Sequence, residues 1–94
     1  MNEPRAVVVT TAHRGVFVGY TTDPDDAERV TLTKARMVVY YSQGTRSVLG
    51  IASSGVAAGS RVSHPVPRIV LRNITAVIDA TAEAAAAWEK GPWQ

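Results

Sequence analysis

Short apolar runs, separated by glycine, proline and asparagine, fill most of the chain before residue 79. Some runs are rich in β-branched residues, and others alternate apolar and polar positions. Both patterns are typical of β-strands. They predict strands at Ala6–Thr10, Gly15–Thr21, Arg29–Thr33, Lys34–Ser42, Arg46–Ala52, Arg68–Arg72 and Ile74–Asp79.

The residues within and between these runs predict where the chain bends. Gly19 lies inside a strand pattern, which indicates a bulge or a sharp curl. A break is expected at Ala35, where the Arg29–Thr33 pattern passes into the next run. Asn73 tolerates a positive φ and predicts a bulge or tight bend between the last two strands. Small residues over Ser53–Pro65 predict a loop.

The periodicity changes near the end of the chain and predicts one short helix over about residues 81–90. Asp79 or Thr81 can cap its start, Lys90 lies in its last turn, and Gly91 follows at the stop position. A helix of this length is not stable alone, so we expect it to dock on the sheet. The face predicted to dock carries Thr81, Ala84, Ala85 and Trp88.

These elements predict a mainly β fold in a single domain over residues 1–94. Its form is a small SH3-like or Sm-like barrel, or a strongly bent antiparallel sheet of five to seven strands, with one short C-terminal helix. The chain contains no cysteine, so neither a disulfide nor a thiolate metal site can reinforce its small core. Domains of this size often bury further apolar surface by assembling with copies of themselves, and a homo-oligomer is therefore expected.

Charge is distributed unevenly along the chain, although the net charge is only +2. Eight of the ten basic residues are arginine, and no acidic residue occurs between Val30 and Ile78. The planar guanidinium of arginine suits phosphate and carboxylate groups. One interpretation is an anion-binding surface. The alternative is that folding, or a second subunit, brings acidic residues back to the arginines and leaves an ordinary solvated surface.

Two classes of binding function follow from these features. In the first, the chain is a non-enzymatic, oligomeric module that binds another protein, because apolar residues occupy both faces of Gly15–Thr21. In the second, the chain binds RNA or a nucleotide, for example by sequestering a signalling nucleotide, with tyrosine stacking beside the cations. The predicted partner contacts are Phe17, Trp88 and Trp93, and the predicted ligand-binding residues are Arg14, Arg36, Tyr40, Tyr41, Arg46, Arg61, His64 and Arg68.

The sequence holds no motif of an enzyme or of a metal site. The Gly-x-Ser-x-Gly elbow of hydrolases is absent, and no Gly-Lys-Ser/Thr follows the glycines near residue 55. The acidic segment "DPDDAE" lacks the spacing and the glycine of a calcium loop, and His13 and His64 lie far apart in the sequence. We therefore predict no catalytic residue, no cofactor and no metal.

The apolar stretches bear on location in the cell. None approaches the roughly 20 residues that a transmembrane helix needs, and the start of the chain lacks the pattern of a signal peptide. The absence of cysteine fits a reducing compartment. A cytoplasmic protein with no membrane partner is therefore expected.

Several segments occur in an order that resembles a known family. They are "RGVFVG" (Arg14–Gly19), "LTKAR" (Leu32–Arg36), the pair Tyr40–Tyr41, "LGIASSG" (Leu49–Gly55), "PVPRIVL" (Pro65–Leu71) and the closing helix with Trp88. Over most of its length the chain is similar to a family of small bacteriophage and prophage proteins of unknown function. The resemblance implies a phage-encoded accessory protein that works in the host cytoplasm, where the partner of the binding module would be a host or phage protein, and it implies no catalytic residue.

Overall fold

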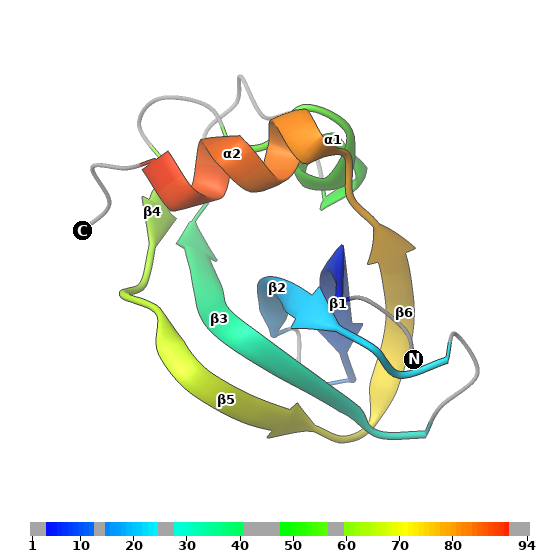
Figure 1. Ribbon diagram of the computed structural model, residues 1–94. Helices are drawn as coiled ribbons and strands as arrows, with labels where there is room; N and C mark the ends of the chain where they lie inside the picture. Colours follow the sequence, from blue (N-terminus) through cyan, green and yellow to red (C-terminus); the bar gives the residue numbers. More distant parts are fainter. Residues whose placement is uncertain (1–3, 13–14, 25–27, 41–47, 57–59, 91–94) are drawn as a thin grey trace.

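The described part of the chain folds into six β-strands and two α-helices (Figure 1). The computed structural model describes residues 4–12, 15–24, 28–40, 48–56 and 60–90. The strands are β1 (Arg5–Thr11), β2 (Val16–Thr21), β3 (Val30–Tyr40), β4 (Arg61–Val62), β5 (Val66–Leu71) and β6 (Ile74–Asp79), and the helices are α1 (Val48–Ser53) and α2 (Ala82–Lys90). The prediction of a mainly β fold with a short C-terminal helix is confirmed.

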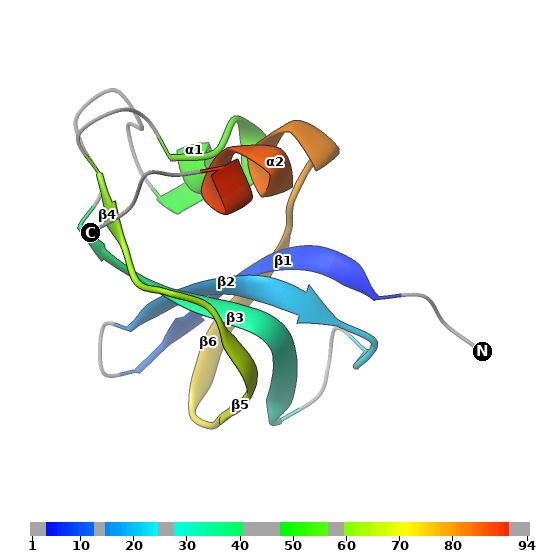
Figure 2. The same ribbon diagram turned by 60° about the vertical axis from the view of Figure 1, so that its left-hand side comes forward.

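All strand pairs are antiparallel and form one sheet in the order β4-β3-β2-β1-β6, with β5 also paired to β3. Besides β2, the long strand β3 pairs with two further strands: Val30 to Ala35 pair with β5, and Val38 and Tyr40 pair with β4, which lies inside the predicted loop Ser53–Pro65. The sheet is strongly bent, as predicted, but among the described residues no pairing joins β5 to β6 (Figures 1 and 2). The strand order is compatible with an SH3-like or Sm-like barrel, but closure is not observed.

A bulge in β3, opposite Gly19 of β2, interrupts the regular pairing of these two strands. The register shifts between Val18 and Tyr20, so that Gly19 faces two residues of β3, of which Lys34 has a φ of 49°. A Cβ on Gly19 would lie 3.0 Å from the carbonyl oxygen of Thr33, so a larger residue would displace backbone. The bend predicted at Gly19 is confirmed. β3 runs on without interruption, and its irregularity lies at Lys34, one residue earlier than predicted.

The turn between β5 and β6 depends on Asn73, which has a φ of 57°. Asparagine adopts this left-handed conformation more readily than most residues. The Asn73 carbonyl oxygen accepts a hydrogen bond from the Ala12 backbone N–H at 2.9 Å, which fixes the turn beside the end of β1. The tight bend predicted at Asn73 is confirmed.

The strand predicted at Arg46–Ala52 is wrong. Val48–Ser53 form the helix α1, and residues 46–47 lie outside the described residues. Short apolar runs do not by themselves distinguish a strand from a buried helix. The consecutive residues Ile51 and Ala52 are both buried in the cluster that includes residues of α2, and this packing selects the helix.

Thr81 caps α2 immediately before its first residue. The Thr81 hydroxyl oxygen accepts the backbone N–H of Ala84 at 3.0 Å, and the hydroxyl donates to the carbonyl oxygen of Ser53 at 3.0 Å. Ala84, Ala85 and Trp88 are buried in a cluster shared with α1 and the sheet. The predicted helix, its cap and its docked face are therefore confirmed, although the Thr81 side chain itself stays exposed.

Two apolar clusters lie on opposite faces of the sheet. One lies between the sheet and the helices and includes Val8, Val18 and Trp88, and the other includes Val7 and Val9. Figure 2 shows both helices on one side of the sheet, with β5 and β6 curving round the other. All three of these β1 valines are fully buried, so both faces of β1 are covered within one chain. Neither helix of the described ranges is long and apolar enough to cross a membrane.

Candidate anion-binding surface

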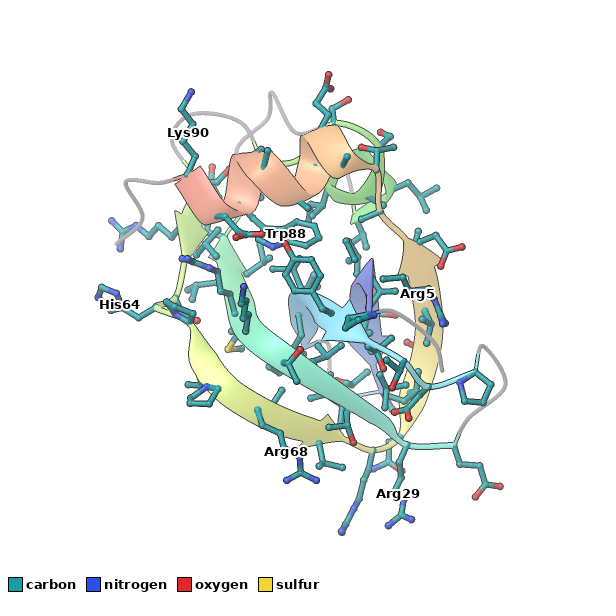
Figure 3. All side chains as sticks on the ribbon, viewed as in Figure 1. Arg5, Arg29, His64, Arg68, Trp88 and Lys90 are labelled. Carbon is teal, nitrogen blue, oxygen red and sulfur yellow. The ribbon has the colours of Figure 1, made fainter. Side chains whose placement is uncertain are left out.

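Four of the predicted ligand-binding residues lie near the end of β3 that pairs with β4. Tyr40 and Arg61 are register partners across these two strands, and both side chains are exposed. Arg36 lies earlier on β3, and His64 follows β4, where it projects from the link to β5 (Figure 3). We call these four residues, Arg36, Tyr40, Arg61 and His64, the β3–β4 corner.

Hydrogen bonds of Ser63 fix the segment after β4 to β3. The Ser63 N–H donates to the Met37 carbonyl oxygen at 2.9 Å, and the Ser63 hydroxyl oxygen accepts the Met37 N–H at 2.8 Å. The Arg36 guanidinium donates to the Ser63 carbonyl oxygen at 3.4 Å, and the Ser63 hydroxyl donates to the carbonyl oxygen of His64 at 3.1 Å. Arg36 is therefore held half-buried, whereas Arg61 and His64 are exposed.

In the described part of the chain, no carboxylate neutralises the arginines of the corner. The strands β3, β4 and β5 all lie within the segment that has no aspartate or glutamate. Among the described residues an ion pair joins Arg5 Nε to Asp79 Oδ1 at 3.3 Å, and none involves Arg36 or Arg61. Within the described residues, folding of one chain therefore brings no acidic residue into an ion pair with Arg36 or Arg61.

Arg68, which the sequence also predicted as a ligand contact, lies apart from the corner. It is the register partner of Thr33 on β3. Figure 3 shows Arg68 and Arg29 at the end of the molecule away from α2, whereas His64 projects from the link between β4 and β5. Arg72 directly follows β5 at this same end. The sequence does not reveal that Arg29, Arg68 and Arg72 lie at the same end of the molecule, because their proximity depends on the pairing of β5 with the first half of β3.

Of the predicted partner contacts, Trp88 belongs to the core of this chain. It is fully buried, and its ring meets the Tyr20 ring edge-on, with 6.3 Å between the ring centroids and 63° between the planes. Phe17 is half-buried against one apolar cluster, and Val18 lies in the other, so the two faces of β2 find apolar partners within the chain. The other predicted site residues, which lie outside the described residues, are Arg14, Tyr41, Arg46 and Trp93.

A cleft of about 290 Å³ opens between β3 and β5 beside the corner, and we call it the β3–β5 cleft. Its lining residues are Phe17, Ala35, Arg36, Met37, Ser63, Val66 and Ile69. Met37 and Val66 are 43% and 44% exposed, and Phe17, Ala35 and Ile69 continue into the apolar cluster inside the curve of the sheet. The cleft lies near the point on β3 where pairing with β5 ends and pairing with β4 begins. The sequence does not reveal this change of partner strand.

The corner and the cleft together offer cations, an aromatic ring and an apolar hollow. Arginine binds phosphate through paired hydrogen bonds, and an exposed tyrosine provides a surface on which a base can stack. Within the ranges described above, no group of three or more histidine, aspartate or glutamate side chains could hold a metal ion. The arrangement is therefore suited to binding an anion or an apolar group.

A family model described as a domain of unknown function matches residues 4–88. The match begins just before β1 and ends within α2, so it includes the corner and the cleft. No curated protein matches the chain, and no solved structure does. The chain therefore belongs to the family of this domain of unknown function, DUF6948.

Proposed function

We propose that this chain is a non-enzymatic protein that binds an anionic ligand, RNA or a nucleotide, at the β3–β4 corner. The observation that carries the proposal is the pairing of the exposed Tyr40 with the exposed Arg61 on strands without carboxylates. Stacking of a base on an aromatic side chain contributes about 1–3 kcal/mol and tolerates any base. An adjacent arginine can bind the phosphate of the same nucleotide.

Arg36 and His64 extend the same surface. The hydrogen bond from Arg36 to Ser63 restrains the guanidinium before a ligand arrives, which reduces the entropy lost on binding. The net charge of +2 favours a short ligand, because nonspecific affinity for nucleic acid grows with the number of phosphates that are neutralised. A nucleotide or a short single-stranded RNA segment therefore suits this surface better than a duplex.

Binding measurements on corner variants test this proposal. The ligands are the four nucleoside monophosphates, followed by calorimetry, and a fluorescent single-stranded RNA, followed by polarisation. Arg61→Glu and Tyr40→Ala are each expected to weaken binding by about tenfold or more, because they remove a charged contact and a stacking surface respectively.

Arg72→Glu is the matched control, since it makes the same charge change at an exposed arginine outside the corner. We expect it to change affinity by about twofold or less at physiological salt. Equal losses from Arg61→Glu and Arg72→Glu would indicate nonspecific attraction. Unchanged affinity in the double variant Arg36→Glu, Arg61→Glu would contradict the proposal.

The β3–β5 cleft supports a second function, that of an oligomeric module that binds protein. The exposed side chains of Met37 and Val66 at the cleft are apolar surface that a partner would bury favourably. A second copy of the chain is the partner we propose first, because small domains gain most from shared apolar surface. A host or phage protein is the alternative occupant.

We also propose a biological setting, that of a phage-encoded accessory protein in the host cytoplasm. Its support is the similarity of segments such as "RGVFVG" and "PVPRIVL" to small phage and prophage proteins. Membership of a family of unknown function is compatible with this setting and adds no activity to it.

A further inference from the structure

Beyond the corner and the cleft, a separate hollow lies beside the bulge between β2 and β3. It has a volume of about 350 Å³ and is lined by Pro4, Tyr20, Thr33 and Lys34. A smaller hollow of about 100 Å³ shares the first three of these residues and extends to Asp23. We call the two hollows together the bulge pocket. Its lining combines a cation, a carboxylate, an aromatic ring and several threonines.

Tyr20 forms a fixed wall of the bulge pocket. Its hydroxyl donates a hydrogen bond to the Glu89 carboxylate on α2, and its ring contacts Trp88 edge-on. The Thr33 hydroxyl donates to the Tyr20 carbonyl oxygen at 3.4 Å. A ligand would therefore meet a wall that is already in place, which lowers the cost of ordering the site.

Asp23 is held in place by hydrogen bonds of three of its groups. Its N–H donates to the Thr21 hydroxyl oxygen at 3.0 Å, and its carbonyl oxygen accepts Arg5 Nη1 at 2.8 Å. Its Oδ2 accepts the backbone N–H of Thr31 at 2.8 Å. Within the described residues Oδ1 has no hydrogen-bond donor, so this oxygen can accept a hydroxyl from a ligand.

Lys34 occupies a backbone conformation that is costly for its type of residue. Its φ of 49° is the left-handed conformation that glycine adopts without strain, and glycine is the usual residue at such a position in a bulge. The Lys34 side chain is exposed and lines the pocket. A strained residue beside a pocket points to a role for its side chain, and here that side chain carries the cation.

We infer that the bulge pocket binds a phosphorylated sugar, either free or as the ribose phosphate of a nucleotide. The Lys34 ammonium binds the phosphate, Asp23 Oδ1 accepts hydroxyls of the sugar, and the Tyr20 ring lies against the sugar's apolar face. Lys34 lines the larger hollow and Asp23 lines the smaller one, and the two hollows share Pro4, Tyr20 and Thr33, so together they favour a ligand with an anionic end and a hydroxyl-rich end. The inference does not rest on the β3–β4 corner, and Lys34 belongs to neither the corner nor the cleft.

Calorimetry on the full chain tests the inference with ribose 5-phosphate, ribose, inorganic phosphate and adenosine monophosphate. Ribose 5-phosphate is expected to bind at least about tenfold more tightly than ribose or phosphate, because only it engages both ends of the pocket.

Lys34→Gly removes the ammonium and relieves the backbone strain. It is expected to lose about tenfold or more in affinity while its Tm is unchanged or higher. Lys34→Arg keeps the charge and is expected to retain most of the affinity.

Arg61→Glu separates this pocket from the corner, because it should leave binding of ribose 5-phosphate unchanged. Binding of adenosine monophosphate without ribose 5-phosphate, lost in Lys34→Gly, would identify a nucleotide as the source of the sugar phosphate. The inference is overturned if neither compound gives heat, or if Lys34→Gly binds as the wild type does. It is also overturned if binding is lost in Arg61→Glu and kept in Lys34→Gly, since the ligand then occupies the corner.

Discussion

At the scale of single residues, Gly55 closes α1 and lies directly against α2. Its φ is 89°, and its N–H donates to the carbonyl oxygens of Gly50 and Ile51 at 3.2 and 3.0 Å. A Cβ here would lie 2.4 Å from the Ala87 Cβ and 3.1 Å from the Ala84 carbonyl oxygen. Gly55→Ala adds both strain and overlap, and we expect it to lower the free energy of unfolding in urea by at least about 2 kcal/mol.

The control for Gly55→Ala is Ser54→Ala at the neighbouring exposed position. Because the Ser54 side chain is exposed, this change should alter the free energy of unfolding by less than about 0.5 kcal/mol. If Gly55→Ala unfolded at the same urea concentration as the wild type, α1 and α2 would not approach each other as closely as described.

Backbone conformation was predictable where the residue type itself signals it. Gly19 lies inside a strand pattern and Asn73 lies between two strand patterns, and both mark bends in the structure. Lys34 gives no such signal, because lysine seldom adopts a positive φ. Its conformation follows from the register of β2 against β3, and the sequence therefore does not predict the bulge pocket.

At the scale of elements, Thr81 joins α2 to α1 through two hydrogen bonds and caps α2 with a third. Its N–H donates to the Ala52 carbonyl oxygen at 3.0 Å, its hydroxyl donates to Ser53, and its hydroxyl oxygen caps Ala84. Thr81→Ala should lower the free energy of unfolding by about 1–2 kcal/mol, measured by circular dichroism in urea. Thr81→Ser keeps the hydroxyl and should recover most of this loss. Equal instability of the two variants would contradict the hydrogen-bonding role.

The two helices differ in how far the sequence reveals them. α2 has a capping threonine, Glu83 in its first turn and Lys90 in its last, and these signals are local. α1 has only six residues, with no acidic residue in its first turn and no basic residue in its last. Burial of Ile51 and Ala52 in the core decides its conformation, and such tertiary packing is not visible in a short apolar run.

At the scale of the whole molecule, the candidate surface was predictable in its chemistry but not in its grouping. The segment without acidic residues left open whether its arginines form an anion-binding surface or are neutralised on folding, and in the described residues Arg36 and Arg61 form no ion pair. Which cations lie together depends on the pairing of β3 with both β4 and β5. This pairing places Tyr40 beside Arg61, separates Arg68 from them and leaves the β3–β5 cleft near the point where β3 passes from β5 to β4.

Self-association through the β3–β5 cleft is a property of the whole molecule that sedimentation velocity can measure. The wild type is expected to form dimers or larger species as its concentration rises, because a second copy would bury Met37 and Val66. Met37→Glu should shift the equilibrium to the monomer by about tenfold or more without lowering Tm, since the new charge would be buried in the dimer, which is costly, but solvated in the monomer.

Leu49→Glu is the control, because Leu49 is an exposed apolar residue of α1 that does not line the cleft. A wild type that stays monomeric at every concentration, or equal effects of the two substitutions, would exclude the cleft as the interface.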